Sequence, residues 1–351
     1  TNLVNAFNDL FGTTVPASGA ASGNDLKALY DLVGDPLFDY LAFTTLLPKA
    51  SSLYNKIKND NTFGALFNSV FGASISAASL SAANRKALFD LVGGAAYDEA
   101  AVSAALPKVN SLYTALSGAG ATDDQRAAFK ALFNTTIPAS LPLNPTELGA
   151  FFGVAATLGY AEGIFLAALV PTGDLLALLR DVSKTAELDA FNLLFDENLK
   201  TTGNVAGSVR KVLFGLTGDP LFNQANLLSA LPRTGGLYTA LKSNATALSI
   251  FNSLFADVLG TSISPFFALT AGPLAVLFGL GGDPSFIPSN FVALLTPANN
   301  LLTALQANTA VLGAFNALFG VNLPASGDIN ATQRAPLFGL VGNPVFNQTN
   351  F

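Results

Sequence analysis

The hexapeptide Ala6-Phe7-Asn8-Asp9-Leu10-Phe11 returns five more times along the chain with small changes. Its two phenylalanines lie at positions i and i+4, and the second one recurs at intervals of 60, 62, 62, 60 and 64 residues. Copies at a nearly constant period indicate a tandem-repeat protein. The six phenylalanine pairs are Phe7/Phe11, Phe67/Phe71, Phe129/Phe133, Phe191/Phe195, Phe251/Phe255 and Phe315/Phe319.

The residues around the first pair predict a helix. Leu3, Phe7 and Leu10 fall on one face of a helix with 3.6 residues per turn. Gly12 follows as a residue that can end the helix in the left-handed conformation. After a turn, a second helix with its own apolar face is expected from about Asn24 to Val33.

Two further short helices are expected in each repeat. Asp35-Pro36 would open the third, with Asp as N-cap and Pro in the first turn, and Leu47-Pro48 would end it. The fourth helix would carry the pair Leu53-Tyr54. The same signals return later in the chain, at Gly218-Asp219-Pro220, Gly282-Asp283-Pro284, Gly342-Asn343-Pro344, Leu106-Pro107 and Leu231-Pro232.

Sustained period-two alternation is absent from the sequence, so strands are not expected. The prediction is an all-α tandem helical repeat of about six ~60-residue units, each with about four short helices. We expect a single solenoid-like array over residues 1–351 with one continuous Phe/Leu-rich core. The approximate units are 1–60, 61–122, 123–184, 185–244, 245–308 and 309–351. Because the first and last are cut within the repeat, the chain is interpreted as a section of a longer array.

Composition excludes several classes of function. Only 11% of the residues are charged and the net charge is −6, without clustered cations, so a nucleic-acid partner is not expected. Membrane contact is not favoured either, because no basic patch is present. The chain contains no Cys and no His, which removes thiolate sites, the commonest metal ligand and the commonest general base. We therefore expect no enzyme activity, no metal and no cofactor.

Two stretches depart from the repeat pattern. Residues 151–170 contain one charge, Glu162, in a run long enough to span a bilayer, although two core helices in the repeat register explain it better. Residues 284–327 contain no charge at all. That segment either meets a partner through an apolar face or is solvated by its Asn, Gln, Ser and Thr side chains.

The repeated aromatic and amide positions allow two interpretations each. The phenylalanine pairs are either inter-repeat core or the lining of a cavity for an apolar ligand, and ordinary core packing is favoured. The Asn that follows the first Phe is Asn8, Asn68, Asn192, Asn252 or Asn316, with Lys130 as the exception. It makes either a specific hydrogen bond, for example to the backbone of a neighbouring unit, or a solvated surface site, and Lys130 favours the solvated site.

In layout alone the chain resembles helical solenoids and the secreted repeat allergens of insects, whose helices enclose a lipid-filled cavity. No signature residues carry either resemblance. The sequence therefore predicts a non-enzymatic, secreted or cell-surface structural protein that self-associates through weakly charged, apolar helical faces. The alternative is a carrier of a lipid, sterol or carotenoid in a Phe-lined cavity.

Overall fold

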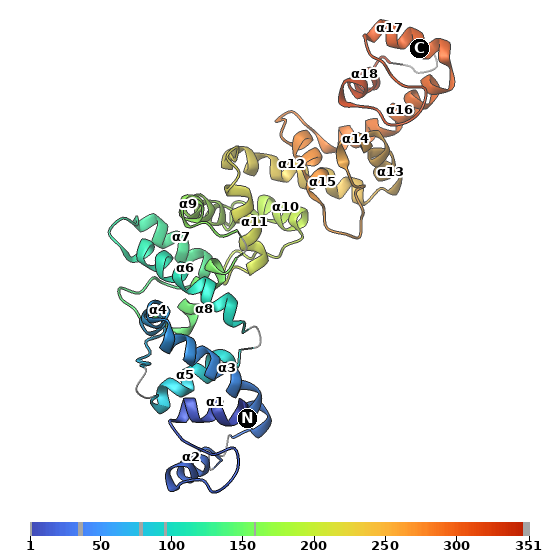
Figure 1. The fold of residues 1–351 in the computed structure, drawn as a ribbon. Helices are drawn as coiled ribbons and strands as arrows, with labels where there is room; N and C mark the ends of the chain where they lie inside the picture. The colour runs from blue at the N-terminus through green and yellow to red at the C-terminus, as the bar shows by residue number, and fades with distance from the viewer. Residues whose placement is uncertain (1, 34–37, 77–79, 95–96, 158, 347–351) are drawn as a thin grey trace. The chain divides into compact units, whose positions relative to one another are not determined.

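The computed structural model describes residues 2–33, 38–76, 80–94, 97–157 and 159–346. Within these ranges the chain forms eighteen α-helices and no strand (Figure 1). The prediction of an all-α protein is confirmed. The helices follow one another in a fixed order, in which a helix bearing the Phe pair precedes a short helix and then a long one.

The first helix of each group carries the phenylalanine pair, except that Phe255 lies at the junction of α13 and α14, and four of these helices begin at a polar cap. Asp60, Thr122, Asn244 and Asn308 accept a hydrogen bond from a backbone N–H of the first turn, which satisfies one of the donors left free at a helix start. These first helices are α1 (Asn2–Phe11), α4 (Asn61–Phe71), α7 (Asp123–Phe133), α10 (Thr185–Phe195), α13 (Ala245–Leu254) with the short α14 (Ala256–Leu259), and α17 (Thr309–Phe319).

The second helix of each group has eleven residues. One position near its middle is a fully buried Leu or Phe in α5, α8, α11, α15 and α18. These helices are α2 (Gly23–Val33), α5 (Ala82–Val92), α8 (Pro145–Ala155), α11 (Gly207–Thr217), α15 (Ala271–Gly281) and α18 (Ala331–Val341).

The prediction of two further short helices is wrong, because they form one long helix with a proline inside it. Proline removes one backbone hydrogen bond and costs about 3 kcal/mol in a helix interior. Buried side chains on both sides of the proline, such as Leu47 and Leu53 around Pro48, offset that cost. The long helices are α3 (Tyr40–Asn59), α6 (Glu99–Ser117), α9 (Glu162–Leu179), α12 (Gln224–Lys242) and α16 (Pro288–Ala307).

The Asp-Pro pairs do not start the long helices. Asp219 accepts from the N–H of Leu221 at 2.8 Å, which makes a turn, and α12 begins only after its N-cap Asn223. Asp283 makes the equivalent turn with Ser285. A side chain that bonds its own backbone two residues ahead competes with helix initiation, so the helix starts later. Asp35-Pro36 lies outside the described residues.

The chain divides into two compact parts, Thr1–Val170 and Pro171–Phe351. In the first part, α3 packs against α1, α4 and α5, and α6 packs against α4 and α8. In the second part, α12 packs against α10, α13, α15 and α16, and α16 packs against α13, α17 and α18. Each of these long helices therefore contacts the first helix of its own group and the second helix of the next group.

The apolar run 151–170 belongs to two helices, since α8 ends at Ala155 and α9 begins at Glu162. Among the described helices, α9 is long and apolar enough to cross a membrane, with a hydropathy of 1.6 and 39% of its residues buried. A second such span is obtained only if α16 and α17, which meet at an angle of 117°, are counted together.

Candidate functional site

The two phenylalanines of each pair have different environments. The first one lies in the core and is at most 6% exposed in every copy. The second one is 7% exposed at Phe255 and half-buried in the other five copies. The first phenylalanines are Phe7, Phe67, Phe129, Phe191, Phe251 and Phe315, and the second are Phe11, Phe71, Phe133, Phe195, Phe255 and Phe319.

The rings of each pair contact one another along the helix. Their centroids are 4.4 Å apart in Phe7/Phe11 and 5.0 Å apart in Phe191/Phe195, and the other pairs fall between these values. Such contacts add about 0.5–1.5 kcal/mol to the burial of the rings. The first ring anchors the helix in the core, and the second extends that aromatic surface outward.

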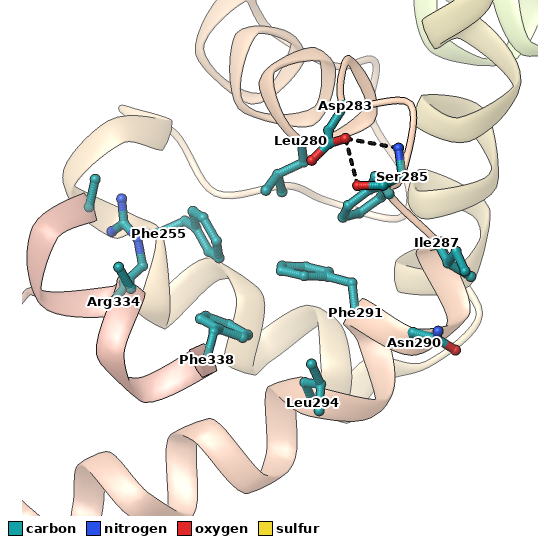
Figure 2. A pocket seen from close by; sticks show the side chains of 13 residues that line it. Phe255, Leu280, Asp283, Ser285, Ile287, Asn290, Phe291, Leu294, Arg334 and Phe338 are labelled. Atoms are coloured by element: carbon teal, nitrogen blue, oxygen red, sulfur yellow. Dashed lines mark hydrogen bonds between the residues drawn. The ribbon is translucent and has the colours of Figure 1, made fainter. Parts of the chain in front are cut away.

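In the C-terminal part, Phe255 reaches an open groove of about 520 Å³ (Figure 2). Phe291 of α16 and Phe338 of α18 lie beside it, with stacked rings whose centroids are 5.3 Å apart. The Phe255 centroid is 6.1 Å from that of Phe291 and 6.4 Å from that of Phe338. Three rings, from the α13/α14 junction, α16 and α18, thus form one apolar wall.

Arg334 closes one side of this groove. Its guanidinium lies over the Phe255 ring at 4.4 Å, and it donates to the backbone oxygens of Leu254 at 2.8 Å and Ile329 at 2.7 Å. It also forms an ion pair with Asp257. Because two carbonyls and a carboxylate already satisfy this charge, Arg334 holds helices together rather than offering a free cation.

The N-terminal part contains a groove of the same construction, about 830 Å³ in volume. Phe11, Phe43 and Phe89 take the places of the three rings described above, and the centroids of Phe43 and Phe89 are 5.4 Å apart. Arg85 lies over the Phe11 ring at 4.8 Å and donates to the Leu80 oxygen at 2.6 Å. Burial lowers the pKa of the Arg85 guanidinium.

The two grooves differ in the charge around the arginine. Thr13 stands two residues after Phe11, where Asp257 stands two residues after Phe255. Within the described residues Arg85 has no ion pair, although Asp31, Asp39 and Asp90 line its groove.

Sequence reasoning missed these arginines. Arg85, Arg210 and Arg334 all bond the backbone oxygen five residues earlier, which fastens the loop that enters the second helix. The sequence did contain a pattern that marks these arginines. Each one precedes a phenylalanine of the second helix by four residues, as in Arg85/Phe89.

The repeated Asn is a backbone clamp, so the favoured interpretation of a solvated site is wrong. Asn68 Nδ2 donates to the Ile75 oxygen at 2.9 Å, and Asn68 Oδ1 accepts from the Ile75 N–H at 3.0 Å. The same two bonds join Asn8 to Val15, Asn192 to Leu199, Asn252 to Ile263 and Asn316 to Leu323. Each clamp lies within its own group and returns an aliphatic side chain from the loop toward the core.

The two grooves also differ in their polar lining, which is mostly charged in the N-terminal groove. No group of three or more acidic residues that could hold a metal occurs in the part of the chain that the structure describes. Asp283 lines the C-terminal groove and is bonded to Ser285, whose hydroxyl and N–H lower the pKa of the Asp283 carboxyl. The C-terminal groove therefore offers aromatic surface and a turn closed by Asp283 and Ser285.

Comparison with known proteins gives no relative: no family model, no curated protein and no solved structure matches this chain.

Proposed function

We propose that this chain is a non-enzymatic structural protein built as a solenoid-like array of six helical repeats. The observation that carries the proposal is the sharing of long helices between successive groups. α12, for example, contacts α10 of its own group and both α13 and α15 of the next group. A helix that completes the core of two neighbours makes every repeat depend on the next, as in known solenoids.

The array associates with copies of itself. Two observations support self-association: large apolar side chains are exposed to solvent, and only 11% of the residues are charged. Phe266 and Phe267 in the loop before α15, Leu221 before α12 and Val182 after α9 are all at least three-quarters exposed. Exposed apolar groups with few charges around them favour association. The uncharged segment 284–327 adds Ile287 and Leu318 to this set.

An extracellular or cell-surface location forms part of the proposal. Its support is the complete lack of Cys, Met, Trp and His, which are among the more readily oxidised side chains. A chain without them survives longer in an oxidising environment.

Sedimentation velocity from low micromolar concentration to the solubility limit, together with electron microscopy, tests the proposal. We expect the sedimentation coefficient to rise with concentration and ordered assemblies to form. The double variant Phe266→Ser, Phe267→Ser should remain smaller at each concentration. A chain that stays monomeric and dispersed throughout contradicts self-association.

A second candidate is binding of an apolar ligand, favoured by the pair of equivalent Phe-lined grooves. Arg85 is the specific reason to consider an anionic amphiphile, because no described residue gives it the carboxylate partner that Arg334 has. Titration with dodecanoate and with dodecylamine, followed by native mass spectrometry, tests this idea. Preferential dodecanoate binding that Arg85→Gln abolishes supports it, and equal binding of both amphiphiles rejects it.

A further inference from the structure

Two second helices have almost the same sequence. Residues 27–33 of α2 read Lys-Ala-Leu-Tyr-Asp-Leu-Val, and residues 86–92 of α5 read Lys-Ala-Leu-Phe-Asp-Leu-Val. The only difference is Tyr30 against Phe89. Both helices also carry an exposed ion pair one turn apart, Lys27 with Asp31 and Lys86 with Asp90. Equal sequences with equal polar borders should bury equal faces.

The apolar faces of these two helices are buried to very different extents. In α5, Val92 is 1% exposed and Phe89 is half-buried. In α2, Val33 is 54% exposed and Tyr30 is 71% exposed. The difference comes from one neighbour, since the long helix α3 precedes α5 in the chain and packs against it. Among the described residues, α1 is the helix that precedes α2, and it is not a long helix.

The same neighbour covers the other second helices. α8 packs against α6, α15 against α12, and α18 against α16. Between α9 and α11, the hydroxyls of Thr172 and Thr217 are 2.6 Å apart. The residues that correspond to Leu29 of α2 are fully buried in all of these helices, namely Leu88, Phe151, Leu213, Leu277 and Leu337.

The contact between the two helix types is close. A Cβ added to Gly281 of α15 would lie 2.3 Å from Thr234 Oγ1 and 3.0 Å from the Thr234 nitrogen of α12. In α3, the position of Thr234 is occupied by Ala50, which is 0% exposed. In α5, the position of Gly281 is occupied by Val92. The second helix with Gly281 thus has Thr234 on its long helix, and the second helix with Val92 has Ala50. Val33 of α2 therefore requires a small residue opposite it.

α17, the Phe-pair helix nearest the C-terminus, supports the same conclusion. Leu318 of α17 is 73% exposed, whereas its counterparts in the other copies are at most 1% exposed. Those counterparts are Leu10, Val70, Leu132, Leu194 and Leu254. α17 has no long helix after it among the described residues, so a long helix is again the element that buries the position.

We propose that the exposed face of α2, formed by Leu26, Tyr30 and Val33, is a docking site for one long helix with the sequence character of α3. A further copy of the three-helix repeat would supply that helix. The inference rests on the proposed array. Phe43 of α3 stacks on Phe89 of α5, and the incoming helix would place an aromatic ring on Tyr30 in the same way.

Binding of a synthetic peptide to the full chain tests the site directly. The probe is a fluorescein-labelled peptide with the sequence of residues 40–59, followed by fluorescence anisotropy. We expect saturable binding with one peptide per chain, weakened about tenfold or more by Val33→Lys in the protein or by Ala50→Lys in the peptide. Leu221→Lys, at an exposed apolar position outside the face, should change the affinity less than about twofold. Equal binding to wild type and Val33→Lys overturns the proposal.

A tethered helix avoids the weak helicity of a short peptide. Joining a copy of residues 38–60 in place of Thr1 reproduces the connection between α3 and α4, because Asp60 is directly followed by α4. Hydrogen exchange of residues 26–33 should then slow to the level of residues 85–92, and Val33→Lys should reverse the effect. Unchanged exchange in α2 overturns the proposal. Both readouts are independent of self-association, so a monomeric chain that binds the peptide would contradict the proposed assembly alone.

Discussion

The substitution Asn192→Ala tests whether the repeated Asn holds the loop that follows each first helix. Asn192 Nδ2 donates to the Leu199 oxygen at 3.0 Å, and its Oδ1 accepts from the Leu199 N–H at 2.7 Å. Leu199 itself is 2% exposed. Alanine removes both bonds and leaves a backbone donor and acceptor of a buried residue without their partner.

The expected cost follows from the number of bonds. Each hydrogen bond contributes a net ~0.5–1.5 kcal/mol, so the free energy of unfolding should fall by about 1–3 kcal/mol. If opening of the loop limits exchange, the Leu199 amide should exchange about five- to 150-fold faster. The effect is local to the group, because this clamp joins residues of the same helix and loop.

Hydrogen exchange of the Leu199 amide and urea unfolding followed by circular dichroism provide the measurements. Lys130 is the natural control, since it lies at the same repeat position and Ile137 follows it at the same spacing of seven residues. Lys130→Ala should change stability little, and Lys130→Asn should add a clamp to Ile137 and slow its exchange. Unaltered exchange of Leu199 in Asn192→Ala would refute the reasoning.

Three further predictions concern single positions. Asp25 accepts from the Ser22 hydroxyl and from the N–H groups of Thr14 and Ser22, which lowers the pKa of its carboxyl. That stabilisation is present above the unfolded-state pKa and is lost as the pH falls through the folded value, so Asp25→Asn should flatten the acid-unfolding profile below about pH 4. The Tyr97 hydroxyl is buried without a partner among the described residues, and burial raises its pKa, so Tyr97→Phe should keep or raise the thermal midpoint. Gly281→Ala places a Cβ against Thr234 and should destabilise by about 1–3 kcal/mol in urea unfolding, and Thr234→Ala in the same chain should recover part of that loss. No recovery in the double variant would contradict the contact.

The sequence by itself determined the helical class of the fold. Apolar residues at i, i+3 and i+4, as in Phe7, Leu10 and Phe11, lie on one face of a helix but on both faces of a strand. The period of the phenylalanine pairs indicated the six copies before any contact was known. The burial of the first phenylalanine, such as Phe191, follows from the same pattern because it lies on the apolar face.

Other features depended on tertiary contacts. Leu47-Pro48 has the local signature of a helix end, yet α3 continues through it because core contacts on both sides outweigh the lost backbone bond. The same holds for the repeated Asn, whose partner lies in a loop that only the fold brings back to the helix. Local helix propensity includes the free-energy cost of a proline or an asparagine in a helix. It does not include the long-range contact that offsets this cost.

The candidate site divides in the same way. The Phe pairs were visible in the sequence, but which ring of each pair would reach a groove was not. Phe255 at the α13/α14 junction, Phe291 of α16 and Phe338 of α18 come together although 83 residues separate the first from the last. The nearly identical sequences of α2 and α5 make the limit plain: Val92 is buried and Val33 is exposed because burial depends on a neighbouring helix, which no stretch of local sequence encodes.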